Sequence, residues 1–167
     1  DNVAFLATPI VLFHNATNEE LRISSGQYAF EFQRIGIAGP YKEYHIEWDN
    51  RAGTFRYFRD HHDEELKRLG LQRQIFLQDV AHALGLDDFH WKGPSWSCFY
   101  HATFNQRPVS VITARGHNPS TIVEGIELFV EAKHLPHKPN FLSVFPVSHV
   151  GTRKFLGDAD LNLSTAE

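Results

Sequence analysis

The chain has little or none of several features that would each mark a class of protein. Its single cysteine, Cys98, excludes an intrachain disulfide framework and favours a reducing compartment, so we expect a cytoplasmic protein. No apolar stretch approaches the roughly 18 residues that a membrane-spanning helix needs, and the residues present carry no signal peptide. The 16 Lys and Arg residues against 20 Asp and Glu give a net charge of −4, without a basic run. We therefore expect neither a membrane nor a nucleic acid as a partner.

What is present is the composition of an ordinary globular protein. Hydrophobic residues make up 42% of the chain and charged residues 22%. A length of 167 residues suits one domain with room for an insertion, and it can bury a substantial core. There is no internal repeat and no low-complexity segment. Composition alone therefore does not indicate the function, which has to be inferred from local sequence patterns.

The most informative segment begins at residue 108, where a strand, a polar loop and a helix are expected in succession. Residues 109–112 form a short apolar run rich in β-branched side chains, which is typical of a buried strand, and the run ends at Thr113. A helix is expected over 119–133, with Asn118 as N-cap and Pro119 at the first helical position. A second short strand is expected at 141–145, so the spacing predicts a β-α-β unit with parallel strands. The side chains predicted to pack this helix onto the strands are Ile122, Ile126, Phe129 and Val130.

The loop after this first strand carries groups that suit an anion. The hydroxyl of Thr113, the guanidinium of Arg115 and a helix N-terminus would meet at the carboxyl end of a strand, where ligands bind in open α/β sheets. Such groups are typical ligands of phosphate. Two other interpretations stay open from the residues alone. Arg115 could pair with a surface carboxylate, and His117 could be only solvated.

Three stretches resemble one bacterial branch of the haloacid dehalogenase-like (HAD) phosphohydrolases: residues 93–96, 112–117 and 139–148. In that superfamily a strand-terminal Thr or Ser hydrogen-bonds a phosphoryl oxygen, so the resemblance assigns this catalytic role to Thr113. It makes the following residues the binding site for a phosphorylated small molecule: Ala114, Arg115, Gly116 and His117. The resemblance covers residues 93–148 well and the rest of the chain loosely.

The resemblance also gives a role to the first residue. The first motif of the superfamily is Asp-x-Asp-x-Thr or Val, in which the first Asp is the nucleophile and the second is a general acid/base. Asp1-Asn2-Val3 matches the second half of this motif. The resemblance therefore implies that Asp1 is the acid/base and a ligand of Mg²⁺, and that the nucleophile lies two residues before it. The alternative is that Asp1 is only a charged, frayed terminus.

The later motifs of the superfamily are less clear in this chain. They require a basic residue and then acidic residues, and the candidates after Thr113 are Lys133, Lys138, Arg153 and Lys154, followed by Asp158 and Asp160. No convincing apolar strand precedes the acidic pair. Residues 164–167 have the pattern of a capping box, which stops inside a helix start. Together with the absence of methionine, this pattern predicts an incomplete chain.

Residues 9–92 carry no recognisable ligand motif, but their patterns predict local structure. We expect a strand at 10–13, a helix from Ser24 or Ser25 to about Ile35, a hairpin of strands 44–48 and 54–58, a helix over 63–84 broken near Gly70, and a helix over 94–106. The predicted fold class is therefore α/β. The resemblance implies a three-layer Rossmann-like (HAD-like) parallel sheet core formed by residues 1–8 and 93–167, with a mixed α+β cap-like insertion over 9–92.

Eleven histidines suggest a metal site at first sight. His61 and His62 lie among carboxylates, but neighbouring residues point to different faces and cannot easily chelate one ion. No His-Glu-x-x-His pattern or paired Cys/His spacing for zinc is present. A structural transition-metal site is therefore not favoured.

Two classes of function follow. The first is a Mg²⁺-dependent phosphohydrolase of the HAD type that acts through an aspartyl-phosphate, or a segment of one. The second is a non-catalytic domain of the same fold that binds an anion or a partner protein. A nucleophilic Asp upstream and an acidic pair downstream would support the enzyme. The sequence names neither the substrate nor the oligomeric state.

Overall fold

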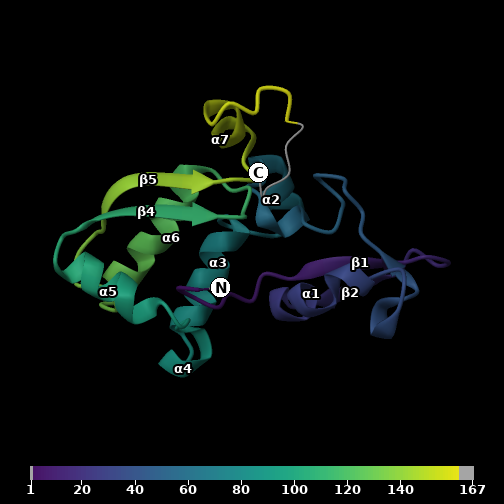
Figure 1. The fold of residues 1–167 in the computed structure, drawn as a ribbon, viewed down its shortest axis with the longest axis horizontal. Coiled ribbons are helices and arrows are strands. Elements are labelled where there is room, and N and C mark those ends of the chain that lie inside the picture. Colours follow the sequence, from purple (N-terminus) through teal and green to yellow (C-terminus); the bar gives the residue numbers. More distant parts are fainter. Residues whose placement is uncertain (1, 162–167) are drawn as a thin grey trace. The chain divides into compact units, whose positions relative to one another are not determined.

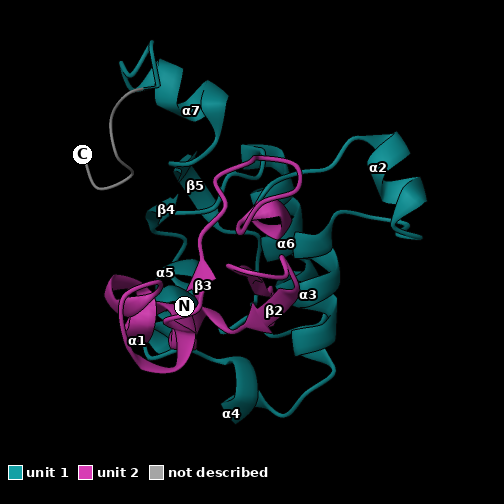
Figure 2. Cartoon of the chain, turned by 90° about the vertical axis from the view of Figure 1, so that its right-hand side faces the viewer, with its two compact units in different colours: residues 1–6, 59–167 teal, residues 7–58 magenta. Residues whose placement is uncertain are grey.

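The computed structural model describes residues 2–161 and shows a mixed α/β protein. The chain divides into two compact units, one formed by residues 1–6 and 59–167 and the other by residues 7–58 (Figure 2). In residues 2–161 no helix is long and apolar enough to cross a membrane.

The first unit contains the predicted β-α-β segment. Strands β4 (Pro108–Thr113) and β5 (Asn140–Pro146) pair in parallel, and helix α6 (Pro119–Glu131) connects them. The register places Val111 beside Val144 and Thr113 beside Pro146, with an irregularity after Val109. The predictions of parallel strands and of Pro119 at the start of the helix are confirmed.

The core of this unit lies on one side of the two strands. Helices α6, α3 (Ile75–Leu84) and α5 (Trp96–Phe104) cover that side (Figure 1). Ile122, Ile126 and Phe129 of α6 are buried there, as the spacing predicts, and Val130 packs against the same cluster. Burial of each such side chain contributes about 1.5–3 kcal/mol. Helices α3 and α6 approach closely, since a Cβ at Gly125 would lie 2.3 Å from the ring of Phe76.

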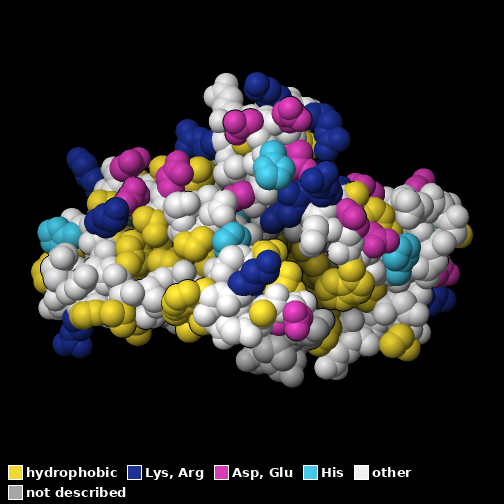
Figure 3. All heavy atoms as spheres, turned by 90° about the horizontal axis from the view of Figure 1, so that it is seen from above, with side chains coloured by type: hydrophobic (Ala, Val, Ile, Leu, Met, Phe, Trp, Pro, Cys, Tyr) yellow, Lys and Arg dark blue, Asp and Glu magenta, His cyan; other side chains and the backbone are white. Residues whose placement is uncertain are grey.

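The opposite side of β4 and β5 is largely open in the part of the chain that the structure describes. Ile112 and Leu142 are 72% and 75% exposed. Apolar side chains gather over this region in Figure 3. The short helix α7 (Val150–Phe155) reaches the open side at its end, where Phe155 stacks on Phe145 with ring centroids 6.1 Å apart. Between residues 2 and 161 the parallel sheet has two strands and one well-covered face.

The second unit is built on a three-stranded antiparallel sheet. Strand β1 (Ile10–His14) pairs with β2 (Glu20–Ile23) on one edge and with β3 (Tyr44–His45) on the other. Helix α1 (Ser25–Glu31) begins with a capping box in which the side chains of Ser24 and Gln27 each accept a backbone hydrogen bond. The predicted strand at 10–13 and the Ser24 cap are confirmed, whereas β2 was not anticipated because its alternation is short.

The predicted hairpin of strands 44–48 and 54–58 is wrong. Strand β3 has only two residues and pairs with β1, and residues 56–58 form a turn of 3₁₀ helix, η3 (Arg56–Phe58). The backbone N–H of Thr54 does donate to the carbonyl of Glu47 at 2.8 Å, but the carbonyl of Thr54 accepts from the N–H of Val11 at 3.1 Å. Strand β1, which is distant in sequence, therefore takes the pairing that the prediction gave to residues 44–48 and 54–58 with each other.

The remaining elements follow the predicted breaks. The helix expected over 63–84 is split into α2 (Asp63–Arg68) and α3, and Gly70 has a positive φ of 68° between them. Single turns complete the list: η1 (Phe32–Arg34), η2 (Gly39–Tyr41) and α4 (Asp88–Trp91). The helix expected over 94–106 is α5.

The boundaries of the two compact units differ from those of the predicted cap-like insertion, residues 9–92. Residues 59–92 belong to the unit that contains α6, because Phe76, Val80 and Trp91 pack into its core. The second compact unit is formed by residues 7–58. Whether it acts as a cap over a site stays a prediction.

Candidate functional site

The carboxyl end of β4 is tied to the chain that leaves β5. The carbonyl of Thr113 accepts from the backbone N–H of Val147 at 2.8 Å, and that of Arg115 accepts from Ser148 at 3.3 Å. The hydroxyl of Thr113 accepts from the N–H of Arg115 at 3.4 Å. Thr113 is half-buried and Ala114 is exposed. The predicted phosphoryl-binding threonine thus lies at a strand end that opens onto a turn.

Arg115 is directed into the unit rather than away from it. Its guanidinium carbon lies 5.1 Å from the centroid of the Phe76 ring on α3. Burial lowers the pKa of this guanidinium to about 10, and the nearby charge of Asp79 opposes the change. Arg115 therefore keeps its positive charge at neutral pH. Among the described contacts of Arg115, the one that the geometry shows directly is with the Phe76 ring of α3.

His117 is the most buried of the predicted site residues. It is 0% exposed, and its ring lies 5.2 Å from that of Phe76, so the interpretation of a solvated side chain is wrong. Burial, together with the charges of Arg115 and His61, lowers its pKa to about 3. His117 is therefore neutral at physiological pH. Neither ring nitrogen has a hydrogen-bond partner among the residues that the structure describes.

The N-terminus of α6 is occupied by a residue that sequence reasoning missed, Asp60. Its Oδ2 accepts from the backbone N–H of Asn118 at 2.9 Å, from the amide of Asn118 at 2.5 Å and from the hydroxyl of Thr121 at 2.8 Å. Its Oδ1 is buried, and residues 2–161 offer it no hydrogen-bond donor. Asn118 stands at the N-cap position as predicted, but its side chain binds Asp60 instead of capping the helix. No local pattern could reveal this contact, since 58 residues separate the partners.

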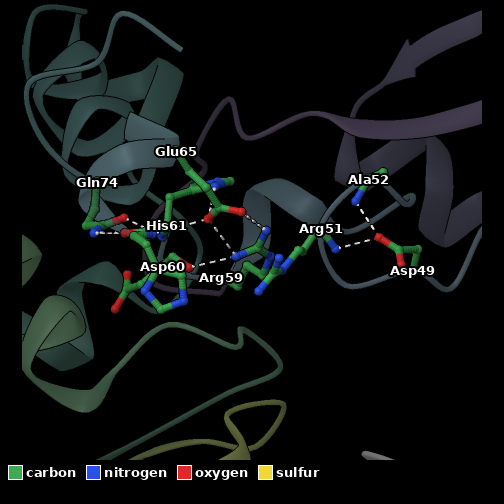
Figure 4. Close-up of polar contacts among 9 residues, drawn as sticks. Asp49, Arg51, Ala52, Arg59, Asp60, His61, Glu65 and Gln74 are labelled. Atoms are coloured by element: carbon green, nitrogen blue, oxygen red, sulfur yellow. Dashed lines mark hydrogen bonds and ion pairs between the residues drawn. The ribbon is translucent and has the colours of Figure 1, made fainter. Parts of the chain in front are cut away.

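Asp60 belongs to a short stretch that is fixed against its surroundings by several contacts (Figure 4). The backbone of Arg59 forms a parallel bridge with Gly116. The two terminal nitrogens of the Arg59 side chain donate to the two carboxylate oxygens of Glu65, each at 3.2 Å. The side chain of Gln74 accepts from the N–H of His61 at 2.8 Å and donates to its carbonyl at 2.9 Å.

The contacts of residues 59–65 lower the pKa values of two of their side chains, Glu65 and His61. The hydrogen bonds from Arg59 lower the pKa of Glu65 to about 2, so its carboxylate stays ionised. Burial and the charge of Arg59 lower the pKa of His61. His61 is buried while His62 is exposed, so the two adjacent rings do not face one site.

Asp1, the predicted acid/base and Mg²⁺ ligand, lies outside the described residues. The chain that follows it runs beside residues 91–95: the carbonyls of Asn2 and Val3 accept from Ser95 and Gly93, and Ala4 forms an antiparallel bridge with Lys92. The predicted proximity of Asp1 to Thr113 therefore stays a prediction.

Three of the acidic and basic candidates of the later motifs form ion pairs. Arg153 contacts the carboxylate of Asp158 at 2.8 and 2.5 Å, and Lys138 forms an ion pair with Glu127. Within residues 2–161 no three His, Cys, Asp or Glu side chains are grouped so that they could hold a metal ion. The predicted helix start at 164–167 lies beyond the described part of the chain.

Comparison of the chain with protein-family models, with curated proteins and with solved structures finds no match. The resemblance of residues 93–148 to the HAD superfamily therefore rests on the motifs themselves, and on the fold only through the parallel strands and their connecting helix.

Proposed function

We propose that this chain forms the phosphoryl-binding part of a Mg²⁺-dependent phosphohydrolase of the HAD type, with a phosphorylated small molecule as substrate. One observation supports the proposal best. Thr113 ends a strand whose parallel neighbour follows through helix α6, so a hydroxyl and a helix N-terminus lie at the same sheet edge. Parallel strands with this connection belong to the α/β folds that bind phosphate at such edges. The three-layer Rossmann-like core is part of this proposal.

The roles in the reaction follow from the resemblance and from ordinary phosphoryl chemistry. An aspartate ahead of Asp1 would attack phosphorus and form an aspartyl-phosphate. Asp1 would protonate the leaving oxygen and then activate water. Thr113 and the N–H groups of the following turn would hold the phosphoryl oxygens as their charge redistributes. The resemblance assigns Mg²⁺ to Asp1, and residues 2–161 assemble no further carboxylates for it.

The second candidate is a non-catalytic domain of the same fold that binds an anion. Two observations bear on the anion site that both candidates share: Arg115 and His117 lie against Phe76, and the carboxylate of Asp60 contacts the start of α6. Both candidates share phosphate binding at the end of β4. They differ in whether a bound ester is cleaved.

The test compares two versions of the protein, the 167-residue chain and a version extended by an added Asp and one further residue before Asp1, which completes the Asp-x-Asp motif. We expect the extended version to hydrolyse p-nitrophenyl phosphate with Mg²⁺ and the shorter one to be near background, since loss of a nucleophile can cost about a millionfold in turnover. Thr113→Ala should abolish phosphate binding in both versions. Ser110→Ala, on the exposed face of the same strand, is the matched control. Phosphate binding without turnover in the extended version would favour the second candidate, and binding that ignores Thr113→Ala would contradict both.

A further inference from the structure

One face of strand β2 and the turn η3 bring four polar side chains together, which we call the β2–η3 cluster. Side chains two residues apart in a strand point to the same face, so Glu20 and Arg22 share one side of β2 while Ile23 is buried on the other. Arg56 of η3 joins them, because its guanidinium forms an ion pair with Glu20 at 2.7 Å. Tyr57 is the fourth member, and its hydroxyl accepts hydrogen bonds from both arginines.

The two guanidinium groups of this cluster converge on one oxygen. A terminal nitrogen of Arg22 donates to the Tyr57 hydroxyl at 3.4 Å, and a terminal nitrogen of Arg56 donates to it at 3.3 Å. The two guanidinium carbons lie 5.7 and 4.8 Å from the centroid of the Tyr57 ring, within the range of a cation–π contact. Two positive charges are therefore held beside one neutral phenol.

The two arginines differ in what balances their charge. Arg56 has 12% of its side chain exposed, and the carboxylate of Glu20 and the carbonyl of Ala52 are further acceptors for it. Arg22 is exposed, and among residues 2–161 no carboxylate forms an ion pair with it. Its polar contact is a neutral oxygen at 3.4 Å, whereas a guanidinium donates to a carboxylate at about 2.7–2.9 Å and roughly twice as strongly. Two arginines and one glutamate leave the cluster with one positive charge in excess.

The excess charge indicates the kind of group that would complete the cluster. A guanidinium presents five N–H donors in a planar fork that matches the two oxygens of a carboxylate. A carboxylate carries one negative charge, which equals the excess, and Glu20 is already bound in this way by Arg56. A dianionic phosphate would exceed the excess charge. A carboxylate is therefore the better match for Arg22.

We propose that Arg22, Tyr57 and Arg56 form a binding site for the carboxylate group of a small molecule. The carboxylate accepts from the guanidinium of Arg22, and Arg56, held by Glu20, contributes the second positive charge beside the Tyr57 ring. The site lies within the unit of residues 7–58, whereas the phosphate site of the proposed function belongs to the other unit. The inference therefore goes beyond the proposed function and does not depend on it.

The first experiment titrates the unaltered 167-residue chain with sodium acetate and follows the NMR signals of the arginine Nε–H groups and of the backbone amides. We expect saturable shifts at Arg22, Arg56 and Tyr57. Sodium chloride at the same ionic strength is the control, because screening acts on all exposed charges alike. Shifts of equal size with chloride, or no saturable shift with acetate, would overturn the inference.

The second experiment repeats the acetate titration with two variants that each lose one positive charge. Arg22→Gln should weaken binding about tenfold, since it removes a hydrogen bond between two charged groups. Arg51→Gln is the matched control, because Arg51 is an exposed arginine of the same unit, and its loss should leave the affinity near that of the unaltered chain. Equal losses in the two variants would show a general attraction of anions to this unit and would contradict a site at Arg22.

Thr113→Ala separates this inference from the proposed function. The acetate shifts at Arg22 and Arg56 should be the same with and without this substitution, whatever it does to phosphate binding at the end of β4. If acetate shifts these signals and phosphate does not bind at Thr113, the carboxylate site stands and the proposed function fails. If the acetate shifts disappear with Thr113→Ala, acetate is not bound by the β2–η3 cluster and the inference is wrong.

Discussion

The two sides of helix α6 differ in how they are held. Its apolar face packs into a core of aromatic and aliphatic side chains, where Phe129 stacks on Trp91 at 5.1 Å and contacts Trp96 at 5.3 Å. Its N-terminal end instead meets a partly buried polar junction of residues 59–65 and 114–118, held by hydrogen bonds and ion pairs. The core is stabilised by area removed from water, which tolerates changes of pH. The junction is stabilised by charged groups whose protonation states must be kept.

The largest effect should come from the core. Phe129→Ala removes a ring that contacts two tryptophans, and such truncations cost about 3–5 kcal/mol of unfolding free energy. Phe89→Ala, at an exposed phenylalanine of the same unit, is the matched control and should change stability by less than about 0.5 kcal/mol. Denaturant-induced unfolding measures both variants. Similar losses for the two would mean that α6 does not organise the core.

The next effect should come from the charged pair of the junction. Glu65→Gln removes the carboxylate charge that the partly buried guanidinium of Arg59 contacts and should cost about 1–3 kcal/mol. Glu64→Gln, one residue earlier and exposed in the same first turn of α2, should be nearly neutral. Denaturant-induced unfolding at neutral pH measures the stability of both variants. If the two variants are equally stable, the pair does not hold residues 59–65 in place.

The pH dependence of unfolding should distinguish the junction from the core. The folded pKa of His117 is about 3, below its usual value near 6.5, so the unfolded state binds the extra proton first. Stability should therefore be lost as pH falls from about 6.5 toward 3. Glu65, whose folded pKa is lowered to about 2, adds a further loss as pH falls below about 4.5.

His117→Phe isolates the first of these windows. The variant keeps an aromatic ring beside Phe76 but removes the titrating group, so the slope of unfolding free energy against pH should decrease between pH 6.5 and 4.5. His101→Phe, at an exposed position on α5, should leave that slope as it is. An unchanged slope in His117→Phe would show that this histidine is not buried in the neutral form.

The core and the junction also differ in how far the sequence predicts them. The apolar spacing of Ile122, Ile126 and Phe129 and the start at Pro119 are local signals, and they predicted α6 and its buried face. The parallel pairing of β4 and β5 followed from the length of the segment that connects them. These features are encoded within residues 108–146, so periodicity and connection length suffice to find them.

The junction could not be predicted in the same way. The contact of Asp60 with Asn118 joins residues 58 positions apart, and neither residue type distinguishes this use from an ordinary turn or cap. Arg115 and His117 were correctly singled out as unusual, but the sequence does not reveal that α3 would place Phe76 against both. The hairpin at 44–58 failed for the same reason, because β1 supplied a distant partner that competed with the local one.

The smallest expected effect concerns the face of β4 and β5 that lies opposite the α6 core. It tests whether this face is covered in solution. Val111 and Ile112 are neighbours on β4, but Val111 packs against the α6 core while Ile112 is 72% exposed. Ile112→Ala removes more carbon atoms than Val111→Ala, yet it should cost less than about 0.5 kcal/mol, against about 1 kcal/mol or more for Val111→Ala. The reverse order, measured by unfolding of the 167-residue chain, would mean that the face of Ile112 is covered in solution. Such a result would support the proposed third layer, because a helix packed on that face is what the Rossmann-like architecture requires.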